Sequence, residues 1–230
     1  MSNILALDTS TDACSAALLL DGKLTQRFTI EPRRHTHLIL PMVEELLAEA
    51  GVALKALDAI AFGRGPGSFA GIRIATGAAQ GLALAADLPV VPVSTLEAMA
   101  CAADEGAGDY LLTALDARMD EVYWCAWQRE NGQLKRLVDE QVCAPSGVCL
   151  PESVANETFV ALGSGWRYRD QMTSAVSDCI GQCSADVYPQ AAIMARLAAA
   201  AVARGETIAP DEARPVYLRD QVAWKKKDQQ

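Results

Sequence analysis

A short pattern that occurs twice constrains the fold of this chain more than any other feature. A run of apolar residues ends in Asp8 and is followed by Asp12, and a similar run ends in Asp116 and is followed by Asp120. The two aspartates of the first copy are separated from those of the second by one constant offset. In each copy a strand, an Asp-Gly or Asn-Gly hairpin turn and a further strand come next. A duplicated strand-and-hairpin unit predicts two related α/β domains.

Helical patterns complete the first copy. Apolar residues recur at helical spacing from Leu38 to Ala50, and Ser94 begins a capping box ahead of a shorter helix. Residues 104–109 are rich in Asp, Glu and Gly and give the best boundary between the two copies. We therefore predict an N-terminal domain of residues 1–104 and a C-terminal domain of residues 105–230.

A glycine-rich turn, Gly63 to Gly71, lies between a short apolar strand and a helix for which Ser68 is a suitable N-cap. Backbone N–H groups at such a helix start can bind an anion. The turn lacks the Lys-Ser/Thr pair of a P-loop, however, and Pro66 removes one amide donor. Inside the helix, Gly77 and Gly81 each cost about 1 kcal/mol relative to alanine. Two explanations are open: close packing on the chain's own sheet, or close packing on another protein.

Composition limits the class of protein. The chain has 230 residues, 51% of them hydrophobic, and no charge-free apolar run long enough to span a bilayer, so we expect a soluble globular protein with no membrane partner. Seven cysteines and no export signal favour free thiols in the reducing cytoplasm. A net charge of −9 argues against autonomous binding of nucleic acid, and the lysines at 225–227 are expected to form a solvated tail.

Two sets of residues are candidates for chemistry. Asp8 and Asp116 each end a predicted strand, which is how actin-like ATPases hold Mg²⁺ and nucleotide phosphates. The loop after the first aspartate has no glycine, however, and the loop after the second carries Arg118. The histidines, His35 and His37, are two residues apart and do not share a helical face, so we do not expect them to bind a metal.

Several motifs together resemble the TsaB (YeaZ) family of bacterial accessory subunits in tRNA modification. The most specific block is Gly65 to Phe69 followed by Gly71, Ile72 and Arg73, and the supporting segments are Leu5 to Ser10, Leu115 to Arg118 and Pro215 to Arg219. The resemblance covers nearly the whole chain. It implies the α/β fold of actin-like ATPases, with two tandem ribonuclease-H-like domains.

The resemblance also implies a role. The catalytic relative TsaD holds its metal with a His-x-x-x-His motif, whereas Ser94 and Ala98 stand at the two ligand positions here and cannot replace imidazole. We therefore expect a non-catalytic subunit required for threonylcarbamoyl transfer to adenosine 37 of tRNA by TsaD, with no catalytic residue, cofactor or metal of its own. The alternatives are an autonomous actin-like ATPase or sugar kinase that uses Asp8 and Asp116, and, last, a metallopeptidase.

The partner surface follows from the same resemblance. The family forms a bundle from the helix after the Gly-Pro-Gly turn and the helix before it, paired with the same helices of TsaD or of a second copy. The expected interface residues are His37, Leu38, Met42, Arg73, Thr76, Gly77, Gln80 and Gly81. Thr76 and Gln80 lie on the more polar side of the helix, so we expect the fold to tolerate arginine there. The expected partners are a TsaD homologue, the TsaE ATPase subunit and, for the chain alone, a second copy; tRNA is expected only through the complex.

Overall fold

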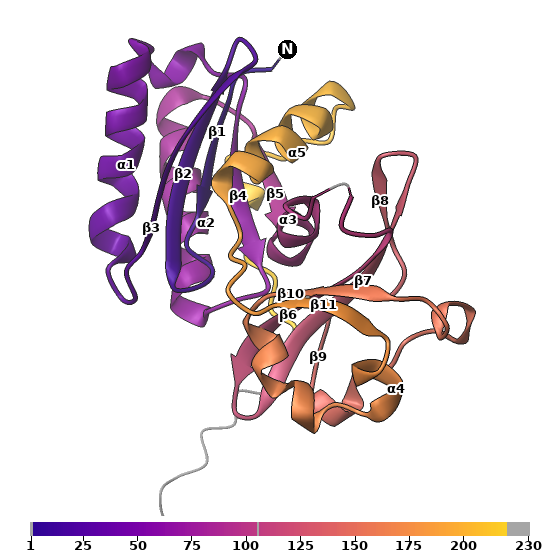
Figure 1. The fold of residues 1–230 in the computed structure, drawn as a ribbon. Helices are drawn as coiled ribbons and strands as arrows, with labels where there is room; N and C mark the ends of the chain where they lie inside the picture. Colours follow the sequence, from indigo (N-terminus) through magenta and orange to yellow (C-terminus); the bar gives the residue numbers. More distant parts are fainter. Residues whose placement is uncertain (1, 105, 220–230) are drawn as a thin grey trace, which may run out of the picture.

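The first of two mixed sheets is built from the N-terminal part of the chain (Figure 1). The computed structural model describes residues 2–104 and 106–219. The strand order is β3-β2-β1-β4-β5, in which β2 is antiparallel to both neighbours and β1, β4 and β5 are parallel. The strands are β1 (Ile4–Asp8), β2 (Ala13–Leu20), β3 (Lys23–Ile30), β4 (Ala59–Gly65) and β5 (Val90–Ser94).

The second sheet repeats the plan of the first. Its order is β11-β10-β6-β7-β8, with β9 paired to β7, and its β6–β7–β8 meander matches β1–β2–β3. The strands are β6 (Tyr110–Arg118), β7 (Glu121–Glu130), β8 (Gln133–Arg136), β9 (Gln141–Cys143), β10 (Phe159–Leu162) and β11 (Ile180–Ser184). Asp21-Gly22 and Asn131-Gly132 both have positive φ, as two-residue hairpin turns require. The predicted two-unit α/β fold is confirmed.

The helices cover both faces of the first sheet. The α-helices are α1 (His35–Ala50), α2 (Phe69–Ala86), α3 (Thr95–Cys101), α4 (Ser174–Ser177) and α5 (Ala191–Ala203). Short 3₁₀ turns are η1 (Leu54–Ala56), η2 (Pro145–Gly147), η3 (Glu152–Val154), η4 (Ser164–Gln171) and η5 (Pro210–Glu212). Helices α1 and α2 pack on one face and α5 on the other (Figure 1). The predicted caps are confirmed, because the hydroxyls of Ser68 and Ser94 accept from the backbone N–H of Gly71 and Glu97.

Helix α5 comes from the second half of the chain and yet completes the core of the first sheet. Its residues Met194, Ala195 and Ala198 are fully buried against the face that β1 and β4 present to it. A division after residue 104 therefore does not separate the two packing units. We propose that the N-terminal unit consists of residues 1–104 together with α5.

Helix α2 is long and apolar enough to cross a membrane by length and composition alone, and it is the one such helix among the described residues. Its buried residues include Ile72, Ala75, Ala79 and Ala83, and that face lies against the first sheet. Arg73 also lies within the helix. Helix α2 is accordingly a core helix of this fold.

A buried ion pair joins the two units. Arg64, in β4, donates to the Glu140 carboxylate at 3.0 Å between Nη2 and Oε2, and the two side chains are only 18% and 6% exposed. The other oxygen of Glu140 accepts from the hydroxyl of Ser94, the residue that caps α3. One carboxylate from the second unit therefore ties together two strands of the first.

Replacing Glu140 with alanine should destabilise the protein strongly, because the Arg64 guanidinium would stay buried without its counter-charge. Removal of one partner of a buried pair costs about 3–5 kcal/mol. Glu206→Ala is the matched control, since the Arg204–Glu206 pair is exposed and such pairs contribute little to stability. Urea unfolding measures both, and equal losses in the two variants would contradict the role given to Glu140.

Candidate functional site

The eight residues expected at a partner surface all lie on α1 and α2, which run side by side on one face of the first sheet (Figure 1). They differ in exposure. His37, Arg73, Gly77 and Gly81 are exposed; Leu38, Met42 and Gln80 are half-buried; and Thr76 is buried. The exposed residues of α2 therefore define the surface that a partner could reach.

Gly77 and Gly81 face open space. A Cβ atom built on either residue would meet no atom within 4 Å outside the local helix backbone, so the described fold does not require a glycine at these positions. This finding rules out close packing on the chain's own sheet as the reason for the two glycines. What stays open is the second explanation, close approach by another molecule.

Large apolar side chains flank the two glycines. Phe69 is 55% exposed at the start of α2 and Leu84 is 60% exposed near its end. The helical repeat places them on the same side as Arg73, Gly77 and Gly81. We call these five residues the α2 surface. Leu40 of α1 is a further exposed apolar residue, on the flank of the buried side of α1. Like Phe69 and Leu84, it was absent from the predicted set.

Thr76 and Gln80 do not lie on this surface, and the expectation that the fold would tolerate arginine there is wrong. Thr76 is 5% exposed, and its hydroxyl donates to the Ile72 carbonyl at 2.7 Å. Gln80 donates from Nε2 to the Pro210 carbonyl at 2.9 Å, beneath the C-terminal segment. Both polar groups are satisfied inside the fold, so their polarity did not signal exposure to solvent.

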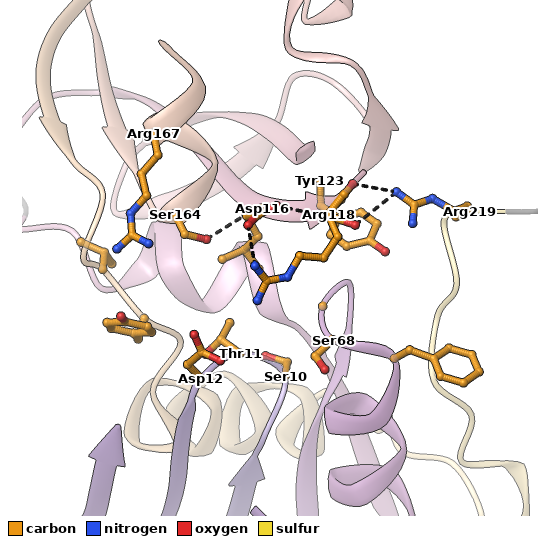
Figure 2. Close-up of a pocket in the computed structure, with 16 residues that line it drawn as sticks. Ser10, Thr11, Asp12, Ser68, Asp116, Arg118, Tyr123, Ser164, Arg167 and Arg219 are labelled. Carbon is orange, nitrogen blue, oxygen red and sulfur yellow. Dashed lines mark hydrogen bonds and ion pairs between the residues drawn. The ribbon is translucent and has the colours of Figure 1, made fainter. Parts of the chain in front are cut away.

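A cleft of about 280 Å³ lies between the two units, at the start of α2 (Figure 2). Its lining comes from the turn after β1, the glycine turn, the β6–β7 turn, η4 and the C-terminal segment. The polar residues that line it are Ser10, Thr11, Asp12, Ser68, Asp116, Arg118, Tyr123, Ser164, Arg167, Tyr188 and Arg219. This is the cleft that the ATPase alternative would use.

Asp116 lines the cleft but is already paired. Its carboxylate accepts from the backbone N–H of Arg118 at 2.7 Å and from the Arg118 guanidinium at 3.1 Å (Figure 2). Its own backbone N–H donates to the hydroxyl of Ser164. An arginine therefore provides the counter-charge at the position where an actin-like ATPase would require a divalent cation.

Asp8 is absent from the lining of the cleft because it is fully buried beneath it. One carboxylate oxygen accepts from the backbone N–H and the hydroxyl of Ser10, at 3.1 and 2.9 Å, and the other has no partner among the described residues. A Cβ on residue 63 would overlap that second oxygen, which explains Gly63. Burial raises the pKa of Asp8 to about 7. The two aspartates thus do not converge on one ligand position, and the ATPase alternative is not favoured.

The turn after β1 also positions α2. The Ser10 carbonyl accepts from the backbone N–H of Ser68 at 2.7 Å, and the Thr9 hydroxyl donates to the Gly71 carbonyl at 2.6 Å. A Cβ on Gly67 or Gly71 would collide with the backbone of this turn. These two glycines, unlike Gly77 and Gly81, are required by the fold.

The two positions that correspond to the TsaD ligands are filled by packing. Ser94 is buried, caps α3 and donates to Glu140, while Ala98 is fully buried against α5 and the first sheet. Within residues 2–104 and 106–219, no group of three or more His, Cys, Asp or Glu side chains could hold a metal ion.

Asp8→Asn should change how stability depends on pH. In the folded protein the pKa of Asp8 is about 7, whereas the ordinary pKa of an aspartate, as in the unfolded chain, is 3.8. At pH values between these two, the folded state binds more protons than the unfolded state. Stability should therefore fall as pH rises from about 4 to about 7 and then level off. Asparagine keeps the shape without the charge and should remove much of this fall. Urea unfolding at pH 5.5 and pH 8 tests it; an unchanged difference between the two pH values would show that Asp8 does not titrate there.

Comparison with known proteins agrees with this geometry. A family model described as TsaD, tRNA N6-adenosine threonylcarbamoyltransferase, matches residues 29–227. The tRNA threonylcarbamoyladenosine biosynthesis protein TsaB of Haemophilus influenzae is 43% identical over 97% of this chain and 96% of its own length, and that of Escherichia coli is 44% identical over 97% of each. The solved structure of YeaZ from Pseudomonas aeruginosa has a TM-score of 0.88 and 45% identity, covering 95% of this chain and 100% of that one. The chain therefore belongs to the TsaB family, also called YeaZ.

Proposed function

We propose that this chain is a non-catalytic subunit in the formation of N6-threonylcarbamoyladenosine in tRNA, and that a TsaD-family transferase is its direct partner. The observation that carries the proposal is the α2 surface, where two interior glycines face open space between exposed Phe69 and Leu84. The relatives named TsaB provide the pathway, since their names describe tRNA threonylcarbamoyladenosine biosynthesis.

The residues at the positions where this fold would carry out catalysis have other roles in this chain. Ser94 and Ala98 are engaged in a cap and in core packing, Asp8 is sealed below the cleft, and Asp116 is paired with Arg118. These residues are therefore either engaged in structural contacts or, in the case of Asp8, fully buried. The proposed role is to support chemistry that takes place on the partner.

The α2 surface suits a helix of another protein. Glycines without neighbouring side chains allow two helix backbones to approach closely, and exposed aromatic and aliphatic side chains at the rim add apolar contact. An acidic chain with a net charge of −9 also needs specific contacts to hold a partner. The TsaD family model matches α1 and α2 as well, so a TsaD-family partner has corresponding helices to present.

A second copy of the chain fits the same surface when the partner is absent. Gly77 lies eight residues after Phe69 (77 − 69 = 8) and seven before Leu84 (84 − 77 = 7). An antiparallel pair of α2 helices that cross near Gly77 would set Phe69 of each copy against Leu84 of the other, which is the self-complementary arrangement of a two-fold interface.

The proposal also includes the TsaE ATPase subunit as a member of the complex, contact with tRNA through that complex, and a cytoplasmic location.

Gly77→Arg should abolish the heterodimer and leave the fold intact. The new side chain has open space in the free chain, and arginine favours a helix over glycine by up to about 1 kcal/mol. In an interface the same side chain would hold two backbones apart. Ala200→Arg on α5 is the matched control, because it adds an exposed arginine on the opposite side of the first sheet. Size exclusion with the TsaD-family partner, together with thermal melting, reads out both effects. A normal heterodimer in Gly77→Arg would move the interface elsewhere.

The isolated chain should transfer no threonylcarbamoyl group to tRNA, and activity should require both this chain and the TsaD-family partner. The measurement is transfer of label to tRNA from a threonylcarbamoyl-adenylate whose threonine is labelled, by each protein alone and by the pair. Transfer by the purified chain alone, after mass spectrometry shows no partner in the preparation, would overturn the non-catalytic assignment.

A further inference from the structure

The C-terminal segment, residues 206–219, crosses the first unit and ends at the second. We call it the strap. Its Ile208 exchanges two backbone hydrogen bonds with Val90 on the open edge of β5, at 2.9 and 3.0 Å. Farther along, the Val216 N–H donates to the Arg64 carbonyl at 2.7 Å. The strap is therefore held at several points as it passes the start of α2.

The side chain of Arg73, in α2, lies between a ring of α2 and a ring of the strap. Its guanidinium carbon lies 3.8 Å from the centroid of the Phe69 ring and 5.5 Å from that of the Tyr217 ring. Its Nε donates to the Tyr217 hydroxyl at 2.7 Å, and the two rings are 5.7 Å apart. Phe69 and Tyr217 are 55% and 43% exposed. We call these three residues the Arg73 platform.

Most N–H donors of the Arg73 guanidinium have no acceptor among the described residues. Within the part of the chain that the structure describes, Arg73 makes no ion pair, and the hydrogen bond from Nε is the one that its side chain forms. Stacking uses the faces of the guanidinium plane and leaves the terminal N–H groups at its edge. By contrast, Arg64, Arg118 and Arg219 are each paired with a carboxylate.

We propose that the Arg73 platform extends the α2 surface, and that the TsaD-family partner presents an Asp or Glu carboxylate to the edge of the Arg73 guanidinium. This inference rests on the proposed function. Arg73 lies one helical turn before Gly77 on the same exposed side of α2, so a partner helix seated on the glycines would reach it. A guanidinium edge matches a carboxylate with two parallel hydrogen bonds.

Charge complementarity supports a carboxylate as the ligand. The chain carries a net charge of −9, which disfavours the approach of an acidic group, whereas Arg73, which has no carboxylate partner among the described residues, attracts one. Such a pair would set the register of the partner along α2, and the exposed rings would exclude water around it. Tyr217 acts as a positioning residue, because its hydroxyl accepts from Nε and its ring limits how the guanidinium can turn.

Affinity for the purified TsaD-family partner, measured by titration calorimetry, tests the proposal. Arg73→Gln should weaken the Kd by about 30-fold or more, since it removes one member of a desolvated charge pair. Arg73→Lys should recover only part of the loss, because lysine has no planar fork. Tyr217→Phe should raise the Kd by a smaller factor. Added to Arg73→Gln, it should raise the Kd of that variant no further. Arg196→Gln, an exposed arginine on α5, is the matched control and should bind as the parent does.

A charge-pair scan identifies the partner's carboxylate. Each Asp and Glu on the two corresponding helices of the partner is changed to its amide. One of these partner variants should bind the parent chain more weakly than the unchanged partner does, yet bind the Arg73→Gln chain as well as the unchanged partner does. Thermal melting checks that every variant is folded.

Three outcomes would overturn the inference. If Arg73→Gln binds as the parent does while Gly77→Arg does not bind, the platform lies outside the interface and the proposed function stands. If both bind normally, the α2 surface itself is wrong. If Arg73→Gln leaves the heterodimer intact but weakens capture of tRNA by the complex, the platform faces RNA and not a carboxylate of the partner.

Discussion

The structure depends on the contact between the turn after β1 and the glycine turn that opens α2. Backbone atoms of Thr9 and Ser10 lie so close to Gly67 and Gly71 that no side chain fits between them. Two hydrogen bonds across this contact, at 2.6 and 2.7 Å, fix where α2 begins. Because an α-helix has a regular geometry, the position of its first turn determines which residues of α2 face the sheet and which are exposed.

The same contact lies next to Asp8, the last residue of β1. Asp8 is fully buried there, and one of its carboxylate oxygens has no partner among the described residues. An unpaired buried carboxylate is costly when ionised, which is why its pKa rises toward 7. A residue that would be a metal ligand in an open cleft is here a buried polar group that shapes the turn. Ser10 therefore takes part both in placing α2, through its carbonyl, and in holding Asp8, through its N–H and hydroxyl.

Apolar packing of α3 on the second sheet joins the two units, and two polar connections add to it. One is the buried Arg64–Glu140 pair, which also includes the Ser94 hydroxyl. The strap makes the other connection, from the edge of β5 to the β6–β7 turn, where Arg219 donates to the Ala117 carbonyl at 3.2 Å. Both connections join residues far apart in the chain, so the cleft between the units is bounded on more than one side.

The sequence by itself determined whatever depends on neighbours along the chain. The Asp21-Gly22 hairpin, the Ser68 and Ser94 caps and the duplicated strand pattern all rest on local hydrogen bonds or on periodicity, and each is found in the structure. Only the tertiary structure decided that Thr76 and Gln80 are covered, that α5 returns to the first sheet and that Tyr217 clamps Arg73. These contacts join distant segments, and a polar residue in a helix looks the same in sequence whether water or another segment satisfies it.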